Sequence, residues 1–188
     1  MDQRIKSIVS ESVRVKEEAF RQNMEKIQSA VAMITDCFKD GRKLLICGNG
    51  GSAADSQHIA AEFVGRFQKE RKALAAISLT TDTSILTCLS NDYQFDCVFS
   101  RQVEALGERG DVFLGLSTSG NSKNVVQAAR AARSKGMRTI AMTGEGGGLL
   151  AEAVELCLAV PSKVTARVQE SHSTIAHVIC ELVEEQFA

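Results

Sequence analysis

The chain has 188 residues, of which 44% are hydrophobic and 24% charged, and its formal net charge is −1. These values are typical of one folded domain and give no electrostatic case for binding nucleic acid or an anionic membrane. No apolar run approaches the roughly 20 residues of a membrane span, and the N-terminus lacks an apolar signal sequence. The six cysteines form no C-x-x-C pair, so we expect reduced thiols. Together these features predict a cytoplasmic protein.

The first forty residues predict a helical arm. Apolar residues recur there at spacings of four, three and four, at Ile27, Val31, Ile34 and Phe38. The apolar stripe continues upstream, with a break expected near residues 16–20. Because this arm carries more apolar surface than a solvated tail needs, we expect it to pack on the domain or on a neighbouring subunit.

Strands and helices alternate after the arm. The predicted strands are 43–47, 74–79, 112–117, 139–143 and 156–160. The predicted helices are 52–67, 83–90, 95–107, 122–136, 148–154 and about 169–187. This alternation predicts an α/β fold with a doubly wound, five-stranded parallel sheet, a three-layer sandwich in which ligands bind beyond the carboxyl ends of the strands.

A glycine-rich loop joins the first predicted strand to the next helix. It reads C-G-N-G-G-S from Cys47 to Ser52, and glycines let the backbone approach a ligand while the new helix offers unpaired N–H groups to an anion. Shortly afterwards His58 and Glu62 stand at i and i+4, which places both side chains on one helix face. An anion cradle beside this pair predicts a phosphorylated substrate and acid–base or metal chemistry.

A hydroxyl-rich loop follows the third predicted strand. It reads S-T-S-G-N-S from Ser117 to Ser122, and hydroxyls with backbone N–H groups can hold a phosphate without a lysine. The Walker pattern is absent, and the dinucleotide pattern G-x-G-x-x-G fails because Ala53 stands at its third glycine. Such a loop also serves as a plain helix cap; its place at the same predicted sheet edge as the glycine-rich loop favours the phosphate interpretation.

All three histidines lie in or near the candidate groups. His172 and His177 belong to the segment R-V-Q-E-S-H-x-x-x-x-H from residue 167 to 177. Gln169 precedes His177 by eight residues, a rise of roughly 12 Å on a straight helix, so one helix cannot bring both to one ion. Either Gln169 lies before the helix on a bent chain, or the two residues come from different subunits. We favour a site at a subunit interface.

Together these groups resemble the sugar isomerase (SIS) domain and, within it, the phosphoheptose isomerase family. The resemblance covers nearly the whole chain, including the helical arm. The shared motifs are G-N-G-G-S at 48–52, H-x-x-x-E at 58–62, G-R at 65–66, N-D at 91–92, S-T-S-G-N-S at 117–122, T-G-x-x-G-G at 143–148 and the 167–177 segment. Some members carry an acid where this chain has Ala166.

The resemblance implies a single SIS domain over residues 1–188, a flavodoxin-like three-layer sandwich in which residues 1–40 form an oligomerisation arm. It also implies a homotetramer with active sites at subunit interfaces. The implied reaction converts sedoheptulose 7-phosphate to D-glycero-D-manno-heptose 7-phosphate through an enediol, the first step of nucleotide-activated heptose biosynthesis. Lipopolysaccharide core and capsule are both open as destinations of the heptose.

The resemblance also assigns residues. The zinc ligands, for one ion per subunit, correspond to His58, Glu62, Gln169 and His177. The substrate-binding residues correspond to Asn49, Gly50, Gly51, Ser52, Glu62, Asn91, Asp92, Ser117, Thr118, Ser119, Ser122 and Gln169. For catalysis we take Glu62 as the base and His177 as its acid–base partner. Asn91 and Asp92 also have an open alternative as plain turn residues.

Two other functions stay open at this point. A non-catalytic SIS scaffold, of the kind that associates with a replication initiator, keeps the fold and the tetramer but lacks the full His/Glu/Gln/His set. The second alternative is a different phosphosugar isomerase, which acts on a five- or six-carbon sugar. Zinc analysis and an assay on sedoheptulose 7-phosphate discriminate among these functions.

Overall fold

A single long helix precedes the sheet. The computed structural model describes residues 1–188, and its first helix, α1, runs without interruption over Asp2–Lys39. The predicted break near residues 16–20 is therefore wrong. Val15, Ala19 and Asn23 are all buried at spacings of four, so one helix face continues through that region.

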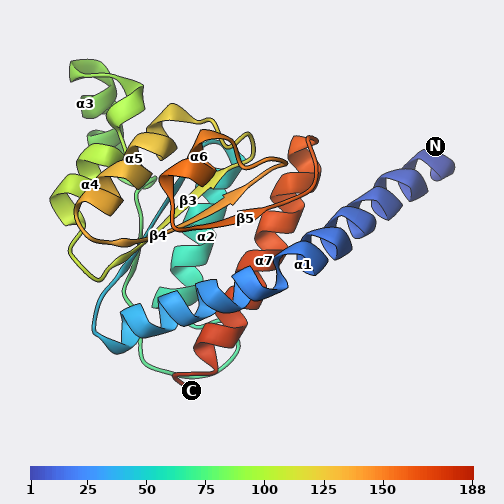
Figure 1. The fold of residues 1–188 in the computed structure, drawn as a ribbon, viewed down its shortest axis with the longest axis horizontal. Coiled ribbons are helices and arrows are strands. Elements are labelled where there is room, and N and C mark those ends of the chain that lie inside the picture. Colours follow the sequence, from blue (N-terminus) through green and yellow to red (C-terminus); the bar gives the residue numbers. More distant parts are fainter.

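The first turns of α1 project from the body of the domain (Figure 1). Ile5, Val9 and Val13 are each about half exposed there, at 54, 55 and 48%. The second half of α1 instead packs on the domain, with Ile27, Ile34 and neighbouring residues in the core. The arm therefore meets its own domain only in part, and its first turns keep an apolar surface open.

The sheet has five parallel strands in the order β2-β1-β3-β4-β5. Their bounds are β1 Leu44–Gly48, β2 Ala76–Ser78, β3 Val112–Ser117, β4 Arg138–Thr143 and β5 Leu156–Ala159. The α/β fold with a parallel sheet is confirmed. Every residue of β1 and β3 is buried, as expected for strands covered on both faces.

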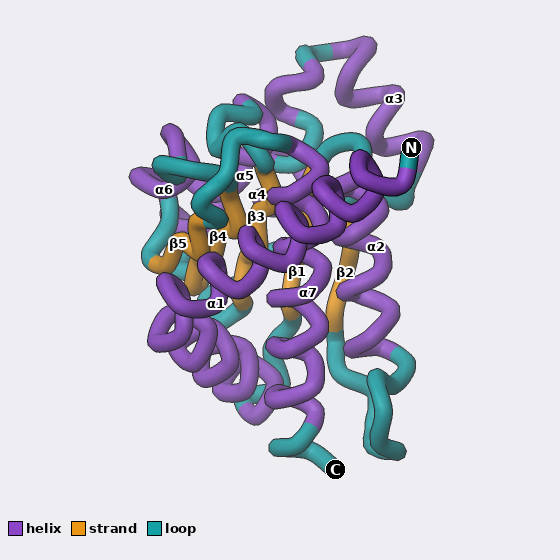
Figure 2. Tube along the Cα trace, turned by 90° about the vertical axis from the view of Figure 1, so that its right-hand side faces the viewer, coloured by secondary structure: helices purple, strands orange, loops and turns teal.

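Helices cover both faces of the sheet, so the molecule has three layers (Figures 1 and 2). α1, α2 (Gly51–Val64) and α7 (Thr165–Glu184) share one core with alternate strand residues such as Leu44 and Ile46. The opposite core holds Leu45 and Cys47 with three further helices. These are α4 (Ser100–Leu106), α5 (Lys123–Ser134) and α6 (Gly148–Ala153).

One helix lies apart from these layers. α3 (Thr83–Asp92) contains no buried residue and stands at a corner of the molecule, beyond α4 (Figure 1). A short 3-10 turn, η1 (Phe95–Cys97), connects it to α4, so the single helix predicted over 95–107 is divided. α3 therefore contributes little to either core.

Two element boundaries bear on function. α7 begins at Thr165, four residues before the predicted start, because Arg167 and Val168 are already buried in its first turn. The chain is therefore not bent between Gln169 and His177, and the alternative that placed Gln169 before the helix is wrong. β2 is limited to Ala76–Ser78, half the predicted strand, because it lies at the sheet edge and pairs with β1 alone.

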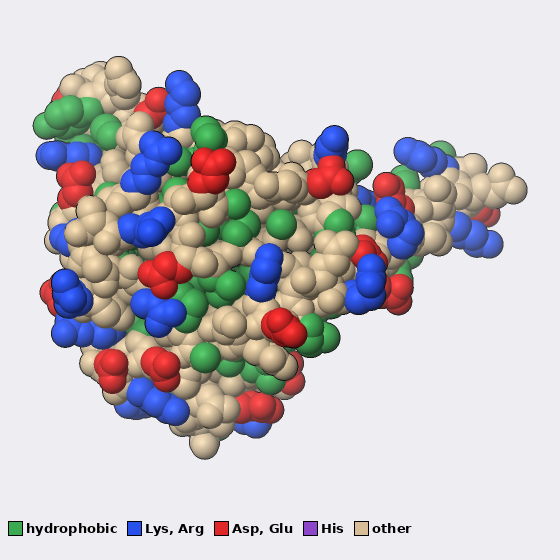
Figure 3. Space-filling view, viewed as in Figure 1, with side chains coloured by type: hydrophobic (Ala, Val, Ile, Leu, Met, Phe, Trp, Pro, Cys, Tyr) green, Lys and Arg blue, Asp and Glu red, His purple; other side chains and the backbone are tan.

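The surface carries acids and bases side by side. Figure 3 shows Lys and Arg next to Asp and Glu over the visible face, in line with a net charge of −1. None of the helices combines the length and the hydropathy needed to traverse a bilayer.

Asp111 joins two strands at the amino edge of the sheet, opposite the ligand edge. Its buried carboxylate accepts the backbone N–H groups of Lys43 (3.0 Å) and Glu108 (2.8 Å) and lies 2.8 Å from Lys43 Nζ. Removing one partner of a buried pair leaves the other polar groups without compensation. This carboxylate therefore fixes the starts of β1 and β3.

We expect Asp111→Ala to lower the free energy of unfolding by about 3 kcal/mol, measured by urea denaturation. Glu108→Gln is the control, because the exposed Arg42–Glu108 pair at 2.8 Å is expected to contribute less than about 1 kcal/mol. Equal effects of the two substitutions would contradict this account of Asp111.

Candidate functional site

Three side chains from two helices meet in one cluster. His58 and Glu62 lie on α2, with His58 Nε2 2.9 Å from Glu62 Oε1. His177 lies on α7, and its Nε2 is 3.2 Å from His58 Nε2. The ligand atoms of all three lie within 4.8 Å of one another. The cluster is open to solvent, since the side chain of His58 is 54% exposed and that of Glu62 is 22% exposed.

The packing of α2 against α7 creates this cluster. Both helices bury apolar faces against the same side of the sheet, including Ile59 and Phe63 on α2 and Ile175 and Ile179 on α7. The polar residues of the two helices therefore meet at the solvent-exposed edge of this shared core. The i, i+4 spacing of His58 and Glu62 places both on that rim, as the sequence predicts.

The donor set of the cluster fits a zinc ion. Two imidazole nitrogens and one carboxylate oxygen are the ligand types zinc takes at tetrahedral sites, and they fill three of four positions. The Nε2–Nε2 distance of 3.2 Å fits a shared ion, because each Nε2 carries a lone pair when the proton of its neutral imidazole is on Nδ1. A cation would accept both lone pairs.

Asp55 lies next to the cluster and was not identified from the sequence. It stands one turn before His58 and accepts a hydrogen bond from Ser173 Oγ at 3.0 Å. Burial raises the pKa of Asp55, while Ser173, His58 and His177 oppose that rise. Its i, i+3 spacing to His58 was a usable signal.

A second site lies at the carboxyl edge of the sheet, where the glycine-rich and hydroxyl-rich loops meet. These loops line a pocket of about 310 Å³. Its lining residues are Asn49, Gly50, Gly51, Ser52, Leu116, Ser117, Thr118, Ser122, Thr165 and Gln169. Eight predicted substrate-binding residues are among them, so the two loops do converge.

The pocket is built to present donors to an anion. α2 begins at Gly51 and α5 at Lys123, and neither helix is capped by the side chain of the residue that precedes it. In the first turn of α5 only the Val125 N–H donates to a side chain, to Asn124 Oδ1 at 3.0 Å. Gly50 makes the turn into α2 with a positive φ of 56°, a conformation that favours glycine. Two uncapped helix N-termini beside a cluster of hydroxyls form an anion-binding arrangement.

Hydrogen bonds hold the two loops in register. The amides of Asn49 and Asn124 pair reciprocally at 2.9 Å in both directions. Ser117 Oγ lies 2.9 Å from Ser122 Oγ and 3.4 Å from Ser119 Oγ. Ser119 is not a lining residue of the pocket; its hydroxyl accepts the Asn121 N–H at 3.1 Å. These hydrogen bonds therefore fix the positions of the two loops relative to each other.

Gln169 belongs to this pocket and not to the cluster. It packs on Gly51, where a Cβ would collide with the Gln169 amide. Because Gln169 and His177 are both in α7, roughly 12 Å of helix rise separates them. Within one chain, the four predicted metal ligands thus divide into a cluster of three and a pocket residue.

Asn91 and Asp92 lie away from both sites. They form the last turn of α3, exposed to solvent, and Asn91 Nδ2 donates to Asp92 Oδ1 at 2.9 Å. The alternative that made them plain turn residues is wrong, since both lie within α3 at its end. Neither residue lines the pocket within the chain.

Two residues of the R-V-Q-E motif, Arg167 and Glu170, contact the helical arm. Arg167 Nη1 donates to the Ile8 carbonyl at 2.9 Å, and its Nη2 donates to Glu170 Oε1 at 2.6 Å. Glu170 Oε2 in turn accepts the Ser12 hydroxyl at 2.6 Å. Arg167 and Glu170 therefore anchor the arm to α7, on either side of Gln169.

The third histidine lies in the core. His172 is 1% exposed, and its Nε2 donates to the Thr143 carbonyl at 3.1 Å, while Nδ1 has no partner. Burial lowers the pKa of His172 to about 4, although the Thr143 hydrogen bond opposes this. The ring is therefore neutral at pH 7, and between about pH 6.5 and pH 4 the unfolded chain binds this proton more readily than the folded chain.

Stability is expected to fall in acid because of His172. The unfolded chain binds this proton near pH 6.5, so the stabilisation is complete above that pH and is lost towards pH 4. Urea unfolding at pH 7 and pH 4.5 is expected to show a loss on the order of 2–3 kcal/mol that the His172→Gln variant lacks. The same pH dependence in both proteins would contradict this assignment.

The sequence and the fold of this chain are both similar to those of known proteins. A family model described as SIS domain matches residues 9–144. The phosphoheptose isomerase of Roseiflexus sp. (strain RS-1) is 56% identical over 176 residues, covering 94% of this chain and 89% of that protein. That of Citrifermentans bemidjiense is 59% identical over 160 residues, covering 85% of this chain and 83% of that protein.

Solved structures agree with these sequences. The structure of phosphoheptose isomerase from Neisseria gonorrhoeae matches with a TM-score of 0.93 and 45% identity, covering 98% of each chain. A phosphoheptose isomerase from Francisella tularensis also matches with a TM-score of 0.93, at 35% identity and 97% coverage of each chain. The fold of this chain therefore matches that of these two phosphoheptose isomerases over nearly its whole length.

Proposed function

The chain belongs to the phosphoheptose isomerase family of SIS-domain proteins, and we propose that it interconverts sedoheptulose 7-phosphate and D-glycero-D-manno-heptose 7-phosphate. It is an isomerase that acts on a phosphosugar. One observation in the structure supports the proposal most strongly. An imidazole–carboxylate–imidazole cluster and an uncapped anion pocket lie along the same two helices.

The proton transfers are assigned to Glu62 and His177. Ketose-to-aldose conversion removes a proton from C1, passes through an enediol and returns a proton at C2. Glu62 Oε1 contacts His58, and its other carboxylate oxygen makes no hydrogen bond within the chain, so it is free to act as the base. His177 moves the proton between the C1 and C2 oxygens.

Zinc is the cofactor we propose for the cluster. His58, Glu62 and His177 would hold it, and when bound it would supply Lewis-acid polarisation of the sugar oxygens. Because a residue bound to a metal is a poorer base, Glu62 and His177 would ligate zinc in one state of the site and transfer protons in another. The phosphate end of the substrate is assigned to the Ser117–Ser122 loop and the start of α2, whose donors orient the sugar. Ser119 remains in this assignment as the hydroxyl that supports Ser117.

We propose that the working site forms between subunits of a homotetramer. Gln169 is separated from the cluster by two turns of α7, and Asn91 and Asp92 lie on an isolated helix, so a neighbouring copy is needed to bring them to one substrate. The half-exposed apolar residues at the start of α1 offer a surface for that association. A cytoplasmic location remains a prediction of the sequence.

The alternatives have less support. The relatives that match over most of the chain are named as phosphoheptose isomerases, which does not favour a non-catalytic scaffold or a shorter phosphosugar. The deciding assay follows sedoheptulose 7-phosphate in D₂O by ¹H NMR. We expect an aldose product with deuterium at C2, because the proton taken up by the base exchanges with solvent while the enediol exists. Absence of conversion would refute the proposal, and deuterium at C2 would support the enediol over a direct shift of hydrogen from C1 to C2.

We expect Glu62→Gln and His177→Gln each to lower kcat by about 10²- to 10⁴-fold, because each replaces a proton-transfer group by an amide that does not titrate. Far-ultraviolet circular dichroism checks the fold. Glu70→Gln is the control, since it removes an exposed carboxylate in the neighbouring loop and is expected to retain full activity. Near-normal kcat in either cluster variant would end that residue's assignment.

Zinc content tests the cofactor directly. We expect close to one zinc per chain in protein purified without chelator, and a loss of most of it in His58→Ala, which removes one of the three clustered ligands. Plasma mass spectrometry measures both. Equal zinc in the variant and the parent protein would place the metal elsewhere.

A further inference from the structure

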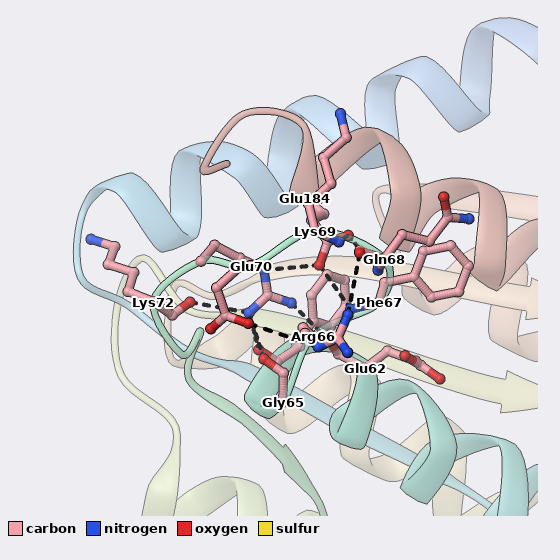
Figure 4. A network of polar contacts seen from close by, with 11 residues as sticks. Glu62, Gly65, Arg66, Phe67, Gln68, Lys69, Glu70, Lys72 and Glu184 are labelled. Atoms are coloured by element: carbon pink, nitrogen blue, oxygen red, sulfur yellow. Dashed lines mark hydrogen bonds and ion pairs between the residues drawn. The ribbon is translucent and has the colours of Figure 1, made fainter.

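A buried carboxylate lies at the end of α7, two turns beyond His177. Glu184 is 1% exposed and accepts three consecutive backbone N–H groups. The donors are Phe67 (2.7 Å), Gln68 (2.6 Å) and Lys69 (2.8 Å), as Figure 4 shows. Burial opposes ionisation of this carboxyl, yet the three donors and Arg71 outweigh it and hold its pKa below the usual value. Glu184 therefore binds the 65–72 loop as an anion.

Arg71 completes this network from the loop side. Its Nε faces Glu184 Oε1 at 3.3 Å, an ion-pair contact without hydrogen-bond geometry. Its Nη1 donates to the carbonyls of Phe63 and Gly65, and its Nη2 donates to the Glu62 carbonyl at 2.7 Å. The guanidinium thus caps the last turn of α2, where free carbonyls favour a cation.

The network reaches the cluster by two routes. Arg71 holds the backbone of Glu62 itself. Glu184 holds the N–H of Phe67, whose ring lies 5.4 Å from the ring of His177, centroid to centroid, with a 40° tilt. His177 and Glu184 are seven residues apart and so share one face of α7, along which the loop runs. The network therefore contacts the backbone of Glu62 directly and the ring of His177 through Phe67.

We propose that Glu184 is a positioning residue for the isomerisation: by fixing the 65–72 loop it holds the Phe67 ring against His177 and the end of α2 beneath Glu62. This inference rests on the function proposed above. The loop is otherwise weakly held, since Gln68, Lys69 and Glu70 are exposed and the Arg66–Glu70 pair is 3.8 Å apart at the surface.

The kinetic test uses Glu184→Gln, which keeps the shape and removes the charge, and Phe67→Leu, which removes the ring. We expect each to lower kcat per folded enzyme by roughly tenfold, with KM changed less than about threefold, because the anion pocket lies at the other end of α2 and α7. Glu185→Gln is the matched control. This neighbouring acid pairs with Lys69 of the same loop at 3.5 Å but is exposed, so both constants are expected to stay unchanged.

A double variant separates positioning from lost stability. If Glu184 acts through Phe67, Glu184→Gln with Phe67→Leu is expected to lose about as much kcat as the worse single variant. Losses that multiply would overturn the proposal. If Glu184→Gln fails to fold, Phe67→Leu still decides: unchanged kcat in that variant overturns the proposal, and a tenfold loss with constant KM supports it.

A structural readout is independent of turnover. The chain has three histidines, so the His177 ring resonance of the zinc-loaded, ¹³C-histidine-labelled protein is assigned by its loss in His177→Gln. We expect Phe67→Leu to remove a ring-current shift from it, Glu184→Gln to move it the same way, and Glu185→Gln to leave it in place. An unmoved resonance in Glu184→Gln overturns the proposal even if the enzyme acts on another sugar.

Discussion

The packing of α2 against α7 is the contact on which the site depends. Neither helix carries the cluster alone: α2 supplies a carboxylate and one imidazole, and α7 supplies the second imidazole at 3.2 Å from the first. Apolar residues from both helices share one core on one face of the sheet, so the energy that orders the helices comes from burial and not from the polar groups. The apolar packing between α2 and α7 therefore fixes the positions of the polar cluster residues.

α7 is fixed near both ends. At its start, Arg167 donates a hydrogen bond to the Ile8 carbonyl of the arm, and Glu170 accepts one from the Ser12 hydroxyl. At its end, Glu184 binds the loop that follows α2. Gln169 and His177 stand between these anchors, one at the anion pocket and one at the cluster. The 167–177 segment thus combines the proposed ligand-binding residues Gln169 and His177 with residues that align the helix carrying them.

Sequence reasoning succeeded where the physics is local. Alternating strands and helices predicted the parallel sheet, and the spacing of His58 and Glu62 predicted a shared face, because both follow from backbone periodicity. It failed at contacts between distant segments. Nothing local to residues 16–20 reveals that the stripe of α1 continues over the sheet. The role of Glu184 depends on a loop 115 residues away in sequence, which no spacing rule reports.

The central claim is that His58, Glu62 and His177 form one zinc site. Anomalous diffraction from crystals of the protein as purified, recorded on either side of the zinc absorption edge, tests it most directly. The account predicts a single strong peak per chain within bonding distance of all three side chains, with Gln169 of a neighbouring copy as the candidate fourth ligand. A zinc peak elsewhere, or none between the two imidazoles, would contradict it.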